Sequence, residues 1–120
     1  MEKKLEFKTF TLDKHQDIAI LKVRERRIYM NVSEQFREEI LKLLDQGYNT
    51  IILDLSNVSV MNSTGIGVVI AMQSTLEKAN GRLKVVGLQP LMREIFQRMR
   101  LEQLFDIEDD VQVALDALQK

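Results

Sequence analysis

The residues whose types and spacing could do chemistry lie in a short polar run, Asn62-Ser63-Thr64-Gly65. The apolar stretch 51–55 precedes it and predicts a buried strand, and an apolar periodic segment follows it and predicts a helix. A hydroxyl at a helix start is accessible, and a phosphate added there would meet free backbone N–H groups and the positive end of the helix dipole. Asn, Ser, Thr and Gly are also the usual residues of loops and helix caps, so the run by itself is a weak signal. Together with the strand and helix around it, the run looks like a regulatory phosphorylation switch, with Ser63 as the candidate acceptor and Thr64 as its nearest competitor.

Ser63 is also a candidate N-cap of this helix, in which case Ser63→Ala would cost about 1 kcal/mol of stability. Gly65 and Gly67 follow it, and each costs roughly 1 kcal/mol relative to alanine inside a helix. They either let the helix pack closely on the sheet or leave the backbone around Ser63 open to a partner. Both explanations can hold together.

The residues needed for catalysis or metal binding are sparse. The chain has no cysteine, and its one histidine, His15, lies in the polar segment 13–17, which predicts an exposed turn. It contains no Gly-x-x-x-x-Gly-Lys run for a nucleotide, and Gly65-x-Gly67 is too short to indicate one. We therefore expect no enzyme activity, no metal site and no cofactor.

Length and composition predict one compact domain over residues 1–120. The chain is 45% hydrophobic and 29% charged, with 17 basic and 18 acidic residues and a formal net charge of −1. This balance gives no electrostatic reason to bind nucleic acid or an anionic membrane, so a protein partner is the expected ligand. No apolar run approaches the roughly 20 residues that span a bilayer. We expect a cytoplasmic protein without membrane insertion.

Hydrophobic periodicity predicts alternating strands and helices. We expect a hairpin with Leu5, Phe7 and Phe10 in its first strand and 18–23 as its second, with the turn at 13–17. The remaining expected elements are a helix over 33–46, a strand over 51–55, a helix over 63–79, a strand over 83–86, a helix from Pro90, a compact connector over 101–107 and a final helix after Asp109-Asp110. The unit from 51 to 86 predicts a parallel crossover. In the helix from Pro90, we expect Leu91, Ile95 and Met99 to face inward.

The run from Asp54 to Gly67 resembles the signature of STAS domains, in particular bacterial anti-sigma factor antagonists, whose usual form is D-L-S-x-V-x-x-M-D-S-[ST]-G-L-G. The order of the expected elements resembles this family over nearly the whole chain. The resemblance implies an α/β fold, with a mixed four- to five-stranded sheet and about four helices packed mainly on one face.

The resemblance also implies a function. In this family, the residue at the position of Ser63 is the phosphoacceptor. The unmodified protein binds an anti-sigma factor serine kinase and so releases the sigma factor, phosphorylation breaks that complex, and a PP2C-type phosphatase resets it. The kinase partner would bind the ATP and magnesium. The residues expected to bind the partner are Asn62, Thr64, Gly65, Gly67 and Ser33.

Two positions depart from the family pattern. Asn62 stands where the family usually has Asp, which keeps a capping oxygen but removes a negative charge. The stretch 24–27, Arg-Glu-Arg-Arg, lies where family members commonly carry Gly-x-[LIV]-[DE], in a loop that contacts their kinases. An alternative therefore stays open: a non-enzymatic STAS subunit of a membrane lipid transporter or signalling scaffold, with Ser63 an interface residue that is never phosphorylated.

Overall fold

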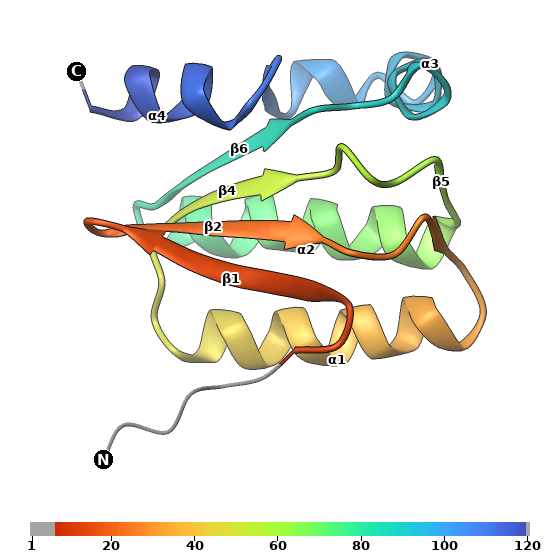
Figure 1. Ribbon diagram of the computed structural model, residues 1–120, viewed down its shortest axis with the longest axis horizontal. Helices are drawn as coiled ribbons and strands as arrows, with labels where there is room; N and C mark the ends of the chain where they lie inside the picture. The colour runs from red at the N-terminus through yellow and green to blue at the C-terminus, as the bar shows by residue number, and fades with distance from the viewer. Residues whose placement is uncertain (1–6, 120) are drawn as a thin grey trace.

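A computed structural model describes residues 7–119, and its centre is a five-stranded mixed sheet (Figure 1). The strands lie in the order β1-β2-β4-β6-β7, with β1 antiparallel to β2 and the remaining neighbours parallel. Their bounds are β1 (Phe10–His15), β2 (Ile18–Val23), β4 (Thr50–Asp54), β6 (Arg82–Val86) and β7 (Asp106–Glu108).

The helices cover both faces of this sheet, but unequally. Their bounds are α1 (Asn31–Asp45), α2 (Ser63–Lys78), α3 (Pro90–Arg98) and α4 (Val111–Leu118). In Figure 1, α1 lies below the strands, α2 is drawn behind β2 and β4, and α4 lies above the strands. Of these four helices, α1, α2 and α3 bury side chains in the main hydrophobic cluster, and α4 contributes to a smaller cluster on the other face. The expected fold class is confirmed, with α4 as the helix on the opposite face.

The alternation of side chains along each strand explains the two clusters. In β4 and just after it, Ile51, Leu53 and Leu55 enter the main cluster, while Ile52 enters the smaller one beside Ala114 of α4. Because side chains alternate across a strand, a central strand covered on both faces must be apolar at nearly every position. The run 51–55, which is apolar except for Asp54, therefore predicted this central strand correctly.

A second, two-stranded sheet holds two connections together at the carboxyl end of β4. In it, β3 (Arg27–Ile28) pairs in parallel with β5 (Val60–Met61). The amide of Asn62 continues this pairing with a 2.8 Å hydrogen bond to the carbonyl of Ile28. The start of α2 is thus fixed against the segment that leads into α1.

Three local expectations need correction or extension. The turn of the first hairpin is shorter than 13–17, because β1 extends to His15 and pairs it with Ile18. The strand β7 was not predicted from the sequence; it pairs with β6, and the ammonium of Lys84 in β6 lies 3.2 Å from Glu108 Oε1 in β7. Leu5 lies outside the described residues.

The inward face of α3 was predicted only in part, because Ile95 packs partly buried against the main hydrophobic cluster as expected, whereas Leu91 and Met99 do not face inward. Met92 and Phe96 are the buried residues of this helix, while Leu91 and Met99 are 50% and 49% exposed. The helix carries two apolar stripes one residue apart, and periodicity alone does not choose between them. A contact with a residue outside the helix selects the buried stripe, because the ring of Phe96 packs against that of Phe105 at a centroid distance of 5.7 Å.

A buried carboxylate fastens the start of the sheet to α1. Glu39 is only 4% exposed, and its oxygens accept hydrogen bonds from the amides of Lys8 at 2.6 Å and Thr9 at 2.8 Å. The hydroxyl of Thr9 and the side-chain amide of Gln35 also donate to it. Burial raises the pKa of Glu39, but these hydrogen bonds, led by that from Thr9, outweigh it and leave the pKa below 4.5.

We expect Glu39→Gln to lower the free energy of unfolding by about 1 to 3 kcal/mol, because the new NH₂ group would face donors. A group with a lowered folded-state pKa contributes stability above its unfolded pKa and loses it as pH falls through the folded value. Urea unfolding should therefore show the largest difference from wild type above pH 4.5 and a shrinking difference in more acidic solution. The exposed neighbour Glu38, changed to Gln, is the control; an equal loss in both variants would contradict the role of Glu39.

Candidate functional site

Ser63 is the first residue of α2 and its side chain is exposed. The chain reaches it from β4 through a short loop and β5, so the serine lies beyond the carboxyl end of a central parallel strand. Sites in open α/β sheets gather at such ends because the connecting loops lie there. The helix carries no acidic residue in its first turn.

Asn62, not Ser63, caps this helix. Its Oδ1 accepts a 2.9 Å hydrogen bond from the amide of Gly65. Its Nδ2 donates to the hydroxyl of Ser33 at 3.2 Å, and that hydroxyl donates to the carbonyl of Met30 at 2.7 Å. The amide group thus both caps α2 and links it to the start of α1. The suggestion that Ser63 itself is the N-cap was wrong.

Because Asn62 caps the helix, the Ser63 side chain does not. The amide of Gly65 is taken by Asn62 and that of Ile66 by the Asn62 carbonyl at 3.0 Å. The amides of Ser63 and Thr64 come earlier in the helix, where no intrahelical acceptor exists. A dianionic group on Ser63 would therefore lie at a helix start with free N–H groups and the positive end of the dipole.

The two glycines of the first turns have different roles. A Cβ on Gly65 would overlap the side chain of Met61 and come within 2.9 Å of Ile28 Cγ2, so this glycine permits close packing against the β3–β5 pair. A Cβ on Gly67 would meet nothing within 4 Å. Gly67 is exposed and leaves an open stretch of backbone beside Ser63.

An apolar groove runs between α1 and α2 next to this backbone. It has a volume of about 300 Å³, and Thr64 and Gly67 line it on the α2 side. Leu41, which is 52% exposed, lines it on the α1 side. Sequence reasoning missed this groove, because it requires two helices to lie side by side, although the spare apolar residue Leu41 was a visible signal.

Of the residues expected at a partner surface, Thr64 and Gly67 line the groove and Asn62 is half-buried beside Ser63. Ser33 is 2% exposed and Gly65 is buried. The structure therefore brings all of these residues together around the start of α2, with Ser33 and Gly65 beneath the surface.

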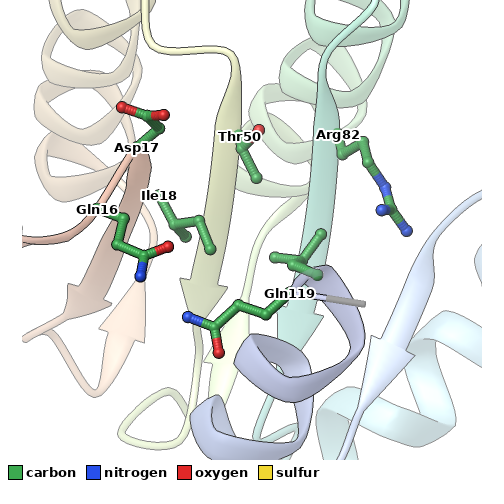
Figure 2. Close-up of a pocket in the computed structure, with 7 residues that line it drawn as sticks. Gln16, Asp17, Ile18, Thr50, Arg82 and Gln119 are labelled. Carbon is green, nitrogen blue, oxygen red and sulfur yellow. The ribbon is translucent and has the colours of Figure 1, made fainter.

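A hollow of about 430 Å³ lies at the other end of the sheet, between the first hairpin and α4. Figure 2 shows its charged side chains, Asp17 and Arg82, on opposite sides of the hollow, so they do not converge on a common point. Across residues 7–119, no group of three or more His, Cys, Asp and Glu side chains is placed to hold a metal ion. Within the same residues, no helix combines the length and apolarity needed to cross a bilayer.

Comparison with known proteins assigns this fold to a family. The model of the STAS domain family matches residues 9–114. The chain therefore belongs to the STAS domain family, as its sequence motif suggested.

Its relatives include anti-sigma factor antagonists. The chain is 30% identical over 95 residues to the anti-sigma-B factor antagonist of Bacillus subtilis strain 168, covering 72% of this chain and 86% of that protein. It is 38% identical over 65 residues to the anti-sigma F factor antagonist of Lysinibacillus sphaericus, covering 53% and 56%.

Solved structures extend this likeness to the fold. The unphosphorylated form of the anti-sigma factor antagonist SpoIIAA superposes with a TM-score of 0.71 at 26% identity, covering 92% of this chain and 97% of that one. The phosphorylated form of the Bacillus cell fate determinant SpoIIAA gives a TM-score of 0.71 at 27% identity, covering 91% and 98%.

Because Asn62 caps the helix and Ser63 does not, substitutions at these two adjacent positions should change the free energy of unfolding by different amounts. We expect Asn62→Ala to lower the free energy of unfolding by about 1 kcal/mol, because both the cap and the link to Ser33 are lost. We expect Ser63→Ala to change it by less than about 0.5 kcal/mol, because the Ser63 hydroxyl does not cap the helix. Urea denaturation of the two variants measures the difference; a larger loss for Ser63→Ala would contradict the assignment.

Substitution of Gly65 and Gly67 by alanine should change the stability of the protein in opposite directions. Gly67→Ala should raise stability by up to about 1 kcal/mol, since it gains helix propensity and meets open space. Gly65→Ala should lower stability by about 1 to 3 kcal/mol, since its methyl group would displace Met61 and Ile28. Thermal unfolding of both variants tests this; the same sign in both would contradict the distinction.

Proposed function

We propose that this protein is a cytoplasmic anti-sigma factor antagonist that works as a phosphorylation-controlled partner switch. In its unmodified form it binds an anti-sigma factor serine kinase and so releases the sigma factor. The observation that carries this proposal is the exposed Ser63 at the first position of α2, with the helix cap supplied by Asn62. A PP2C-type phosphatase would restore the unmodified serine.

The position of Ser63 suits a switch that acts at an interface. Phosphorylation adds a charge of about −1.5 to −2. At a helix start the dipole tolerates that charge, so the fold around Ser63 should persist. A partner surface that fits an uncharged hydroxyl would instead meet a bulky dianion. About 2.7 kcal/mol of desolvation and repulsion weakens binding roughly a hundredfold.

The surrounding residues divide into contact and support. Ser63, Thr64 and Gly67 are the proposed contacts, because Ser63 and Gly67 are exposed and Thr64 lines the same groove as Gly67. Asn62 is proposed to hold the first turn and to border the partner. The buried Ser33 and Gly65 support it from beneath, the first through its hydrogen bond to Asn62 and the second by close packing.

The relatives support this reading. The Bacillus subtilis and Lysinibacillus sphaericus relatives are anti-sigma factor antagonists, and SpoIIAA has been solved in unphosphorylated and phosphorylated forms. In this chain the modified position would be Ser63, because it is the exposed hydroxyl at the start of α2. Thr64 is half-buried at the groove and is less accessible to a kinase.

We expect a phosphoryl group on Ser63 that changes between growth and stress. Intact mass measurement with site mapping, on protein purified from its native cell, should show a shift of about 80 Da at Ser63. Ser63→Ala should abolish the shift, and Thr64→Ser should leave it in place. Absence of the shift across growth, starvation and stress conditions would overturn the switch in favour of a constitutive subunit or scaffold.

Binding gives the second readout of the same prediction. The purified anti-sigma factor kinases encoded in the same genome should include one that binds the wild type and Ser63→Ala with similar affinity. Ser63→Asp should bind that kinase at least about tenfold more weakly while its urea unfolding midpoint stays close to wild type. Unchanged affinity in a folded Ser63→Asp variant would contradict interface control.

A further inference from the structure

The segment Arg24–Met30, here named the basic loop, connects β2 to α1 and contains β3. Arg24, Arg26 and Arg27 are all exposed in it. With Glu25 and Ser59 they line an open hollow of about 440 Å³. Three arginines and one glutamate give this loop a formal charge of +2 (three minus one), although the whole chain carries −1.

Backbone hydrogen bonds fix the basic loop in place. The amide of Arg24 donates to the carbonyl of Thr9 at 2.8 Å. The amide and hydroxyl of Ser59 donate to the carbonyl of Arg26 at 2.8 and 2.9 Å. The loop is therefore tied to the same β5 connection that delivers Ser63, and its arginines and Ser63 belong to one end of the molecule.

Within the part of the chain that the structure describes, these three arginines form no ion pairs. The ion pairs among residues 7–119 use Arg37, Lys84 and Arg98, and none of them uses Arg24, Arg26 or Arg27. Glu25 lines the same hollow but lies beyond ion-pair distance of all three guanidinium groups. Three guanidinium groups are thus available to carboxylates from outside, which they bind with paired hydrogen bonds.

Apolar side chains complete the surface. Tyr29 is 40% exposed and Met30 is 74% exposed, directly after the arginines. Arginine, tyrosine and methionine are the residue types enriched at protein interfaces, and tyrosine and arginine supply many of their strongest contacts. Met30 also holds a positive φ of 54°, an unusual conformation for a side chain of this size. The loop therefore has both the charge and the composition of a docking surface.

We propose that the basic loop docks an acidic surface of the protein partner that also covers Ser63. This inference rests on the proposed function for the identity of that partner and adds its chemistry. It also gives phosphorylation a second effect. A phosphate on Ser63 places negative charge opposite the partner's carboxylates and competes with them for the arginines.

A protein partner fits these residues better than a nucleic acid. Nucleic-acid binding draws on a basic face that contacts on the order of 6 to 10 phosphates. Here the surface offers three arginines, one glutamate and two large apolar side chains, on a chain whose net charge is −1. Tyr29 and Met30 would be left exposed on a phosphate backbone but buried on a protein.

The first test is a titration of the isotope-labelled full chain with an octaglutamate peptide, followed by amide chemical shifts in 50 mM salt. Shifts should concentrate in residues 24–30 and 59–62, weaken as salt is raised, and vanish in the double variant Arg26→Glu with Arg27→Glu. The matched control changes the exposed Lys42 and Lys78 to Glu, which gives the same net charge of −5 (−1 minus 4) and should keep the shifts.

Three results of this titration would overturn the proposal. One is the absence of shifts in the basic loop, and another is an equal response to an octalysine peptide. The third is tighter binding of a single-stranded DNA oligomer of equal charge, which would assign the loop to nucleic acid. The milder pair Arg26→Gln with Arg27→Gln repeats the test with less risk to folding, and should lose most of the shifts.

The second test uses the anti-sigma factor kinase that binds the unmodified chain. Arg26→Glu with Arg27→Glu should slow its association about tenfold at low salt, while the Lys42 and Lys78 control changes it less than about twofold. If Ser63→Asp leaves binding unchanged but the arginine variant weakens it, the switch fails and the docking surface holds. If only Ser63→Asp weakens binding, the switch holds and the docking surface fails.

Discussion

The start of α2 depends on one residue that is bonded in three directions. The Asn62 amide hydrogen-bonds the carbonyl of Ile28, its Oδ1 caps the helix at Gly65, and its Nδ2 reaches the hydroxyl of Ser33. These bonds connect β3, α2 and α1 at a single point. The exposed Ser63 follows directly, with a fixed backbone and a side chain that the fold does not use. The fold therefore uses Asn62 and leaves the adjacent Ser63 for the proposed phosphorylation.

The same division of roles continues along the helix. Gly65 faces the β3–β5 pair, where only a hydrogen atom fits, and Gly67 faces solvent, where a methyl group would fit easily. A residue that costs helix propensity without a packing reason indicates a need outside the fold. A partner that binds in the apolar groove beside Gly67 could approach the helix backbone closely, which would give a functional reason for a glycine at this position.

Much of this arrangement could be predicted from the sequence, and the failures have physical causes. The central strand, both long helices and the exposed serine follow from strong periodicity and a specific motif. The face of α3 does not, because Leu91 and Met92 begin two equivalent stripes and only Phe105, distant in sequence, selects one. The short strand β7 forms by pairing with β6, and its three residues carry too little pattern to reveal it in the sequence. The cap at Asn62 was ambiguous because asparagine and serine cap equally well.

The two departures from the family pattern, Asn62 and the stretch 24–27, both change the electrostatic charge near the start of α2. Asparagine at position 62 removes a carboxylate beside Ser63, and the arginines of the basic loop add positive charge to the connection bonded to it. Both changes make the unmodified surface more positive. One phosphoryl group of about −2 offsets the formal +2 of the basic loop. On an acidic surface, the same phosphoryl group would only make an already negative potential more negative. Here it would cancel the positive charge that is proposed to attract the partner, so a single modification would change the net charge of the whole surface.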